Sequence, residues 1–188
     1  MPTLLQQMME RRLKLLHRSK AVKGFTLIEL LIYMGLLSLF LTAATTSTWD
    51  IILGSVKSAV QQEVQENLRY AAYRLQFEIR NANSINASSD FNVNFASDPS
   101  AIFSLSAPSP NNPTEFRVAN NVLQVKRGGG GWGALTSSAV EVTNLIFTDL
   151  SDSASENAKF IITIRYENPG GRSQWEKEET FEGAAQLR

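Results

Sequence analysis

The sequence predicts an α+β fold in which one long N-terminal helix packs on a C-terminal antiparallel β-sheet. Residues 25–44 form an almost uninterrupted apolar run, and residues 45–84 continue with apolar side chains at steps of three and four. Residues 85–188 then contain short segments in which apolar and polar side chains alternate. A period near 3.6 indicates a helix and a period of two indicates strands. With residues 1–24 as a basic N-terminal segment, the chain divides into four parts.

Charge is unevenly distributed along the 188 residues, although the formal net charge is zero. Residues 1–24 contain six basic residues and one acidic residue, a net charge of +5, so the remainder carries a net charge of −5. Basic residues before an apolar segment predict a cytoplasmic N-terminus and a C-terminal domain outside the cytoplasm. Because the basic excess is confined to this segment, nucleic acid is not an expected partner.

The apolar run from Phe25 to Ala44 has the length of a single transmembrane span. Its twenty residues rise by roughly 30 Å as a helix, which matches the hydrocarbon core of a bilayer. One alternative is a secretory signal cut near Thr42-Ala43-Ala44, and a second is a plain signal anchor. Neither alternative explains Glu29, which is the only charged residue in the run.

The start of this run, Lys23-Gly24-Phe25-Thr26-Leu27-Ile28-Glu29-Leu30-Leu31, resembles the type IV pilins and type II secretion pseudopilins. Their precursors have a basic leader that ends in Gly, followed by Phe and an apolar run with Glu at its fifth position. The resemblance implies that residues 1–24 are a cytoplasmic leader and that prepilin peptidase cuts between Gly24 and Phe25. It also implies N-methylation of Phe25 and a pilin-like fold.

The same resemblance gives Glu29 a part in assembly. A carboxylate in hydrocarbon is unfavourable unless it is paired. In an assembly, Glu29 of one subunit can face the Phe25 amine of its neighbour, and the pair would fix the axial register between subunits. The alternative is that Glu29 lies at the level of the lipid headgroups and is solvated.

Beyond the membrane segment, the helix is expected to continue as an amphipathic helix. Apolar residues recur on one face, and Asn and Ser residues around Asn83 end the pattern, so we predict one helix from Phe25 to about Asn83. The β-branched run Thr42–Thr48 is a place where the helix could loosen. Trp49 either anchors at the membrane interface or packs against protein. The apolar face consists of Ile52, Val56, Val60, Val64, Leu68, Ala71 or Ala72, Leu75, Ile79 and Ala82.

The C-terminal part is expected to form one antiparallel sheet, with a face on the stripe from Val56 to Ile79. Asn120-Asn121 suits a tight hairpin turn, and Pro169-Gly170-Gly171 suits a turn into a last strand over 173–181. The other predicted strands cover 91–95, 102–105, 115–118, 122–125, 140–147 and 160–166.

Each of three further segments has a structural interpretation and, as an alternative, a binding function. The glycine-rich segment 128–133 lacks the pattern of a phosphate loop, so we expect a flexible loop, with a partner contact through Trp132 as the alternative. A solvated loop is expected at Asp149, Asp152 and Glu156, with calcium binding as the alternative. The C-terminal acidic residues predict the solvated face of a strand, with an acidic docking face as the alternative; they are Glu176, Glu178, Glu179 and Glu182.

The sequence offers no catalytic set, metal site or cofactor site. Cysteine is absent, and the only histidine, His17, lies in the predicted leader. Without these side chains, most nucleophile–base pairs and transition-metal sites are excluded. We therefore expect a protein that is not an enzyme.

The resemblance implies a structural subunit of a type IV pilus or of a type II secretion pseudopilus. The stretch Leu75–Arg80 and the ending Gln186-Leu187-Arg188 resemble J-type minor pseudopilins and W-type minor pilins, which favours a minor subunit. The implied partners are other pilin subunits through their N-terminal helices, prepilin peptidase, the inner-membrane assembly platform and membrane lipid. The implied location is the inner membrane, and a filament after assembly. The alternative is a membrane-anchored binding module that captures surfaces or DNA without forming a filament.

Overall fold

The computed structural model describes residues 24–153 and 155–187, and these form two compact units that meet after Trp49. Helix α2 (Leu27–Arg80) contributes its first residues to one unit and the remainder, from Asp50, to the other. The predicted helix is confirmed, but it begins two residues after Phe25 and ends at Arg80 rather than near Asn83. Residues 1–23 of the predicted leader lie outside the described residues.

The described residues of the first unit, 24–49, consist mainly of the apolar part of α2. Its side chains are exposed apart from Glu29, which is half-buried. The helix is continuous through Thr42–Thr48, where we expected it to loosen. The Thr42 hydroxyl donates to the Ser38 carbonyl at 2.8 Å, and the Thr48 hydroxyl donates to the Ala44 carbonyl at 2.8 Å. Such bonds satisfy the hydroxyls inside the helix, so these threonines do not require water.

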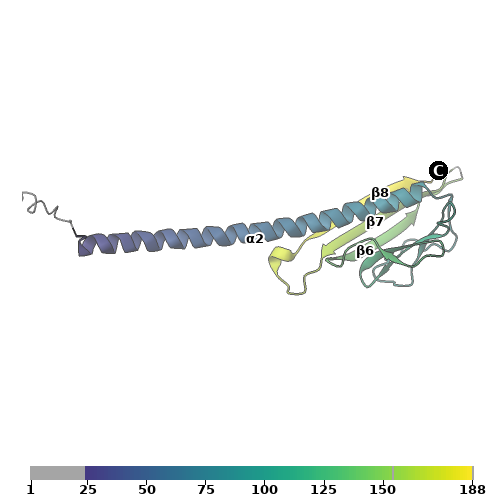
Figure 1. The fold of residues 1–188 in the computed structure, drawn as a ribbon. Helices are drawn as coiled ribbons and strands as arrows, with labels where there is room; N and C mark the ends of the chain where they lie inside the picture. The colour runs from purple at the N-terminus through teal and green to yellow at the C-terminus, as the bar shows by residue number, and fades with distance from the viewer. Residues whose placement is uncertain (1–23, 154, 188) are drawn as a thin grey trace, which may run out of the picture. The chain divides into compact units, whose positions relative to one another are not determined.

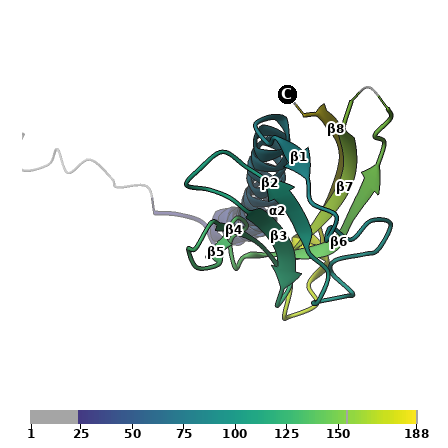
Figure 2. The same ribbon diagram turned by 90° about the vertical axis from the view of Figure 1, so that its right-hand side faces the viewer.

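The second unit contains two antiparallel sheets rather than the single sheet expected. One has the order β1 (Ser84–Ile85), β2 (Phe103–Ser106), β3 (Thr114–Ala119), β4 (Val122–Arg127) and β5 (Gly133–Ala134). The other has the order β6 (Val140–Asp149), β7 (Asn157–Tyr166) and β8 (Glu178–Gln186). Figure 1 shows β6–β8 beside the second part of α2, and Figure 2 shows the two sheets as separate layers beside the end of the helix. The predicted helix-on-sheet fold is confirmed.

One predicted strand is absent, and another is shifted along the chain. The segment Phe91–Phe95 is irregular, because Asn92 has a φ of 58° and interrupts the extended backbone. It still covers the free edge of β6, since the Asn92 N–H donates to the Phe147 carbonyl and the Phe95 N–H donates to the Leu145 carbonyl. The last strand begins five residues later than expected, because Ser173–Trp175 forms a short 3₁₀ helix, η1, after the turn.

The hairpin at Asn120-Asn121 is confirmed. Both residues have positive φ values, 53° and 60°, which asparagine tolerates better than most residues and which a two-residue turn between twisted strands requires. The turn sets the register of β3 and β4, in which Ala119 lies opposite Val122 and Phe116 opposite Val125.

The core of the second unit lies between α2 and the two sheets. Phe103 of β2 and Phe147 of β6 are stacked with ring centroids 4.0 Å apart, which joins the sheets. The buried stripe of α2 begins at Val60, whereas Val56 is half-buried and Ile52 is 46% exposed. The stripe is therefore shorter than the sequence pattern predicted. Its buried apolar members are Val60, Val64, Leu68, Ala71, Ala72, Leu75 and Ile79.

Candidate functional site: the start of the apolar helix

The backbone around Gly24 and Phe25 precedes the helix. Residues 24–26 are not helical, and the first helical hydrogen bond runs from the Leu30 N–H to the Thr26 carbonyl at 3.1 Å. The Thr26 hydroxyl oxygen accepts from the Glu29 N–H at 3.2 Å, so Thr26 is the N-cap. The Gly24–Phe25 peptide bond therefore lies outside the hydrogen bonding of α2.

Neither Gly24 nor Phe25 is held by the rest of the described chain. A β-carbon built on Gly24 would have no atom within 4 Å, so packing does not require a glycine there. Phe25 is 74% exposed, and its ring contacts only the edge of Tyr33, with centroids 6.0 Å apart. This peptide is thus accessible from several sides, as a substrate peptide must be.

Glu29 occupies the first turn of α2, three residues after the N-cap. A negative side chain there interacts favourably with the positive end of the helix dipole. The sequence Thr26-x-x-Glu29 also has the form of a capping box, in which the carboxylate can turn back toward the N-cap backbone. Among the described residues, the Glu29 carboxylate has no ion pair, so its charge is available to a group outside this chain.

The apolar surface that follows has no cover within the first unit. Large apolar side chains from Leu27 to Leu41 are 53–83% exposed. The helix is long and apolar enough to cross a membrane by length and composition. Exposed apolar side chains at this density are unfavourable in water, so lipid or other apolar helices must surround them.

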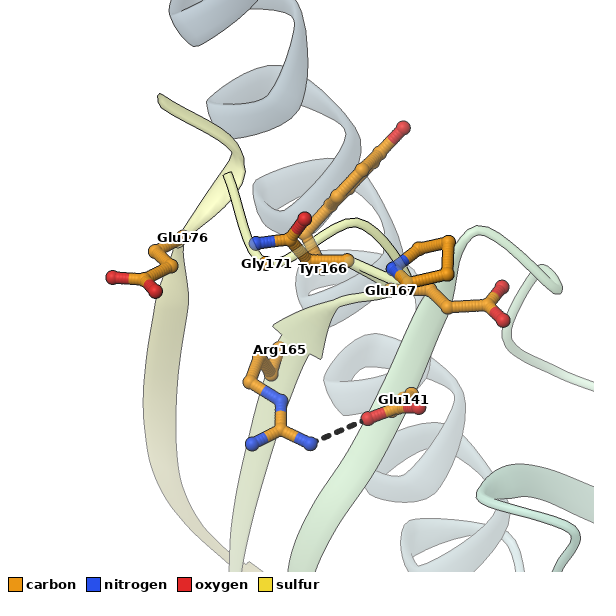
Figure 3. Close-up of a pocket in the computed structure, with 8 residues that line it drawn as sticks. Glu141, Arg165, Tyr166, Glu167, Gly171 and Glu176 are labelled. Atoms are coloured by element: carbon orange, nitrogen blue, oxygen red, sulfur yellow. Dashed lines mark hydrogen bonds and ion pairs between the residues drawn. The ribbon is translucent and has the colours of Figure 1, made fainter. Parts of the chain in front are cut away.

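One hollow of the second unit lies where the start of β6 and the end of β7 meet the turn after Tyr166, and charged side chains line it (Figure 3). The hollow has a volume of about 470 Å³, and Glu141 accepts from the Arg165 guanidinium at 2.6 Å across it. The hydrogen bond from Arg165 to Glu141 raises the pKa of Arg165. This ion pair engages Arg165 and Glu141, whereas Glu167 and Glu176 line the hollow without belonging to it. The described residues contain no group of three potential metal ligands.

The acidic loop also binds its own backbone. Hydrogen bonding from the Ser151 side chain, and next from the Ser151 N–H at 2.8 Å, lowers the pKa of Asp149. The Glu156 carboxylate accepts from the Ile85 N–H at 2.6 Å, and this hydrogen bond links the loop to β1. Both carboxylates thus accept hydrogen bonds from the protein backbone.

Side chains of the glycine-rich segment and of the C-terminal acidic segment contact other elements of the second unit. The Trp132 ring lies under the Arg117 guanidinium at 4.1 Å and is half-buried, so it packs on β3. Glu178 and Glu182 are exposed on β8, as the expected solvated face requires, whereas Glu179 turns toward α2 and accepts from the Gln65 amide at 3.3 Å.

Sequence reasoning missed two features of α2. Glu78 is buried and paired with Arg127, which lies 49 residues away, and no local pattern indicates such a contact. Tyr70, Tyr73 and Phe77 are exposed aromatic residues on the face opposite the sheets. A helical wheel drawn around the predicted apolar stripe would have shown the aromatic residues.

The N-terminal part matches a known sequence family. Residues 19–45 match the family model described as the prokaryotic N-terminal methylation motif. The searches of curated proteins and of solved structures gave no significant match. This motif is that of type IV pilins and pseudopilins, which are structural subunits and not enzymes, and which are anchored in the inner membrane before they assemble with other pilins. The chain thus carries a prokaryotic N-terminal methylation motif at residues 19–45, and the helix-on-sheet fold that follows it is pilin-like.

Proposed function

We propose that the chain is a minor structural subunit of a type IV pilus or type II secretion pseudopilus. In this proposal, prepilin peptidase removes residues 1–24 and the new N-terminus, Phe25, is methylated. The mature subunit then enters a filament through its N-terminal helix, with the assembly platform and membrane lipid as further partners.

The geometry at the start of α2 carries the proposal. A peptidase binds its substrate in an extended form, and the Gly24–Phe25 bond lies before the helix with open space around Gly24. Cleavage would leave a positive amine beside the positive end of the helix dipole, which is unfavourable for an isolated helix. In the assembly, the Glu29 of a neighbouring subunit would supply the compensating charge, with both groups desolvated.

Minor status rests on the resemblance of Leu75–Arg80 and of the C-terminal residues to J-type and W-type subunits. The presence of Glu29 also distinguishes the chain from the K-type subunit at the tip, in which the equivalent residue can be absent.

A comparison of two Glu29 variants tests the proposal in the native host. Glu29→Gln retains the Thr26 cap and the capping-box form but removes the charge, whereas Glu29→Ala removes both. The fraction of the chain that co-sediments with sheared filaments or with extracted assembly complexes is measured. We expect both variants to be lost from the assembly, and Glu167→Gln, the same change at an exposed carboxyl in the second unit, to assemble normally.

The N-terminus is determined by mass spectrometry in the same samples. The proposal requires a methylated Phe25 in the wild-type chain. An intact leader would overturn it and would favour the membrane-anchored binding module. If Glu29→Gln assembled as the wild type does, Glu29 would act only in helix capping, and the proposed charge pairing would be wrong.

A further inference from the structure

Among the described strands, one sheet edge is both long and uncovered. The edge strands of the first sheet, β1 and β5, have two residues each. The outer edge of β6 is bonded by the segment 92–95, in which the Asn92 N–H donates to the Phe147 carbonyl at 2.8 Å. In contrast, β8 has nine residues and ends its sheet, with β7 on one side (Figure 2). Open edges can pair with other chains, so proteins usually shorten or cover them.

The hydrogen bonds at the two ends of β8 show which of its residues face the open edge. The Leu187 N–H donates to the Glu156 carbonyl, on the side of β7. At the other end, the Lys177 carbonyl accepts from the Tyr166 N–H, also on that side. Backbone groups of successive strand residues point to opposite sides, so the odd-numbered residues of β8 bond to β7. The even-numbered residues present their N–H and C=O groups at the edge; they are Glu178, Thr180, Glu182, Ala184 and Gln186.

These edge groups have no hydrogen-bond partner within the described part of the chain. The contacts of α2 with β8 involve odd-numbered residues on the inner face. The Gln65 amide donates to the Glu179 carboxylate at 3.3 Å, and a β-carbon added at Gly183 would lie 2.9 Å from Nε2 of Gln76. Donors and acceptors that recur at every second residue are satisfied together by another extended strand, and a helix has no free backbone groups to offer them.

The sequence of β8 lacks the features that usually block such pairing. It contains no proline and no lysine, and its register with β7 is unbroken from Glu178 to Gln186. Proline, lysine and bulges are the common protections of an edge strand. The edge is therefore regular enough to accept a further strand along its length.

Charge across the sheet specifies the chemistry of that strand. Glu141 of β6 lies opposite Arg165 of β7, and Arg165 lies opposite Glu178 of β8. The Glu141 carboxylate accepts from the Arg165 guanidinium at 2.6 Å. The Glu182 side chain pairs with Lys159 at 2.6 Å but is still 60% exposed. Acidic, basic and acidic side chains thus alternate across the strands, and the open edge is acidic, so a basic side chain is favoured on the next strand.

We propose that the open edge of β8 binds an extended strand of another protein, with basic side chains opposite Glu178 and Glu182. Directly opposite residues of neighbouring strands share a face of the sheet, so these side chains lie beside the two carboxylates. The inference goes beyond the proposed function and does not depend on it, because pairing at β8 needs neither cleavage of the leader nor assembly through α2.

The same charges disfavour a second copy of this chain as the occupant. A symmetric antiparallel pair of β8 strands centred on Glu182 would place the two Glu182 carboxylates opposite each other. Like charges in directly opposite positions are destabilising. The acidic side chains therefore act against self-pairing and leave the edge open to a basic strand.

Amide hydrogen exchange in the full chain tests the proposal. The chain is held in micelles of a non-ionic detergent, and exchange is followed residue by residue by NMR. The probe is a peptide of the same length as β8, with valine at alternate positions and lysine or threonine between them. Its lysines are spaced to lie opposite Glu178 and Glu182. The control peptide has glutamate in place of lysine.

The two sets of amides in β8 should respond differently to the probe. We expect exchange of the edge amides of Thr180, Glu182 and Ala184 to slow by about tenfold when about nine-tenths of the chain is bound. The amides of Phe181 and Gly183, which are already bonded to β7, should change much less. The glutamate peptide should bind about tenfold more weakly, which corresponds to the loss of two cross-strand charge pairs.

Two substitutions at Ala184 provide a matched pair. Ala184→Pro removes an N–H that points to the open edge, so no bond to β7 is lost, and edge strands tolerate proline at such positions. It should abolish the slowed exchange at Thr180 and Glu182. Ala184→Val keeps the N–H and should bind the peptide as the wild type does.

Several results would overturn the proposal. Absence of slowed exchange in the wild type at saturating peptide would show that the edge does not accept a strand. Equal slowing at Phe181 and Gly183 would indicate general stabilisation, and unchanged binding by Ala184→Pro would place the peptide elsewhere. Equal binding of the lysine and glutamate peptides would refute the basic partner. Slowing of the edge amides by the chain alone, as its concentration rises, would identify a second copy as the occupant.

Discussion

Replacement of Glu78 by alanine should destabilise the second unit more than any other single charge removal on α2. Glu78 is 8% exposed, and its Oε1 atom lies 2.8 Å from Nη2 and 2.9 Å from Nε of Arg127. The same oxygen is 3.0 Å from Nη2 of Arg74. The Nε atom of Arg127 makes the hydrogen bond, whereas Nη2 is buried at ion-pair distance without hydrogen-bond geometry. Glu78→Ala would leave two guanidinium groups facing each other without a carboxylate.

The size of this effect follows from the burial of each group. Removing one member of a buried ion pair costs about 3–5 kcal/mol. The two arginine side chains are 27% and 30% exposed, so water can solvate part of their charge. We therefore expect a loss of about 2–3 kcal/mol in the free energy of unfolding. At about 2–4 °C per kcal/mol, Tm should fall by about 4–12 °C.

Thermal unfolding of the full chain in detergent micelles, followed by near-ultraviolet circular dichroism, measures this change. Arg74→Met is the control, because it removes two weaker contacts. These are the pair with Glu78 one helical turn away, worth about 0.5 kcal/mol or less, and the contact with the Phe77 ring at 5.2 Å, worth about 0.5–1 kcal/mol. If Glu78→Ala lowered Tm no more than Arg74→Met does, Glu78 would not be the link between α2 and β4, and the reasoning from burial would be wrong.

Two further predictions concern a turn and an ion pair. Gly128→Ala should be strongly destabilising, by about 3 kcal/mol or more, because Gly128 has a φ of +54° and an added β-carbon would lie within 2.3 Å of the Pro110 carbonyl oxygen. Gly129→Ala, with no atom within 4 Å, should change Tm little; equal effects in thermal unfolding would contradict this geometry. The hydrogen bond from Lys177 lowers the pKa of Glu179, so its stabilising contribution is present above the usual carboxyl pKa and is lost as pH falls through the lowered value. Glu179→Gln should therefore flatten the acid side of a Tm-against-pH curve, and an unchanged slope would show that the group does not contribute.

Several elements could be predicted from the sequence because neighbouring residues alone determine their backbone conformation. Asn120-Asn121 predicted a tight turn, and the structure has positive φ at both residues. The alternation at Phe91–Phe95 predicted a strand and was wrong, because burial of alternate side chains does not require a paired backbone. There, Asn92 breaks the extended conformation and the segment bonds to the edge of β6 instead.

The sequence by itself determined the long helix, its membrane-length apolar part and the motif around Gly24, Phe25 and Glu29, whose roles stay predictions. These features depend on residue type and on spacing within a few turns of one helix. Only the tertiary structure decided that the strands divide into two sheets and that Glu78 meets Arg127. Contacts between residues far apart in the chain depend on how the helix and the sheets share one core, and short-range periodicity carries no information about that arrangement.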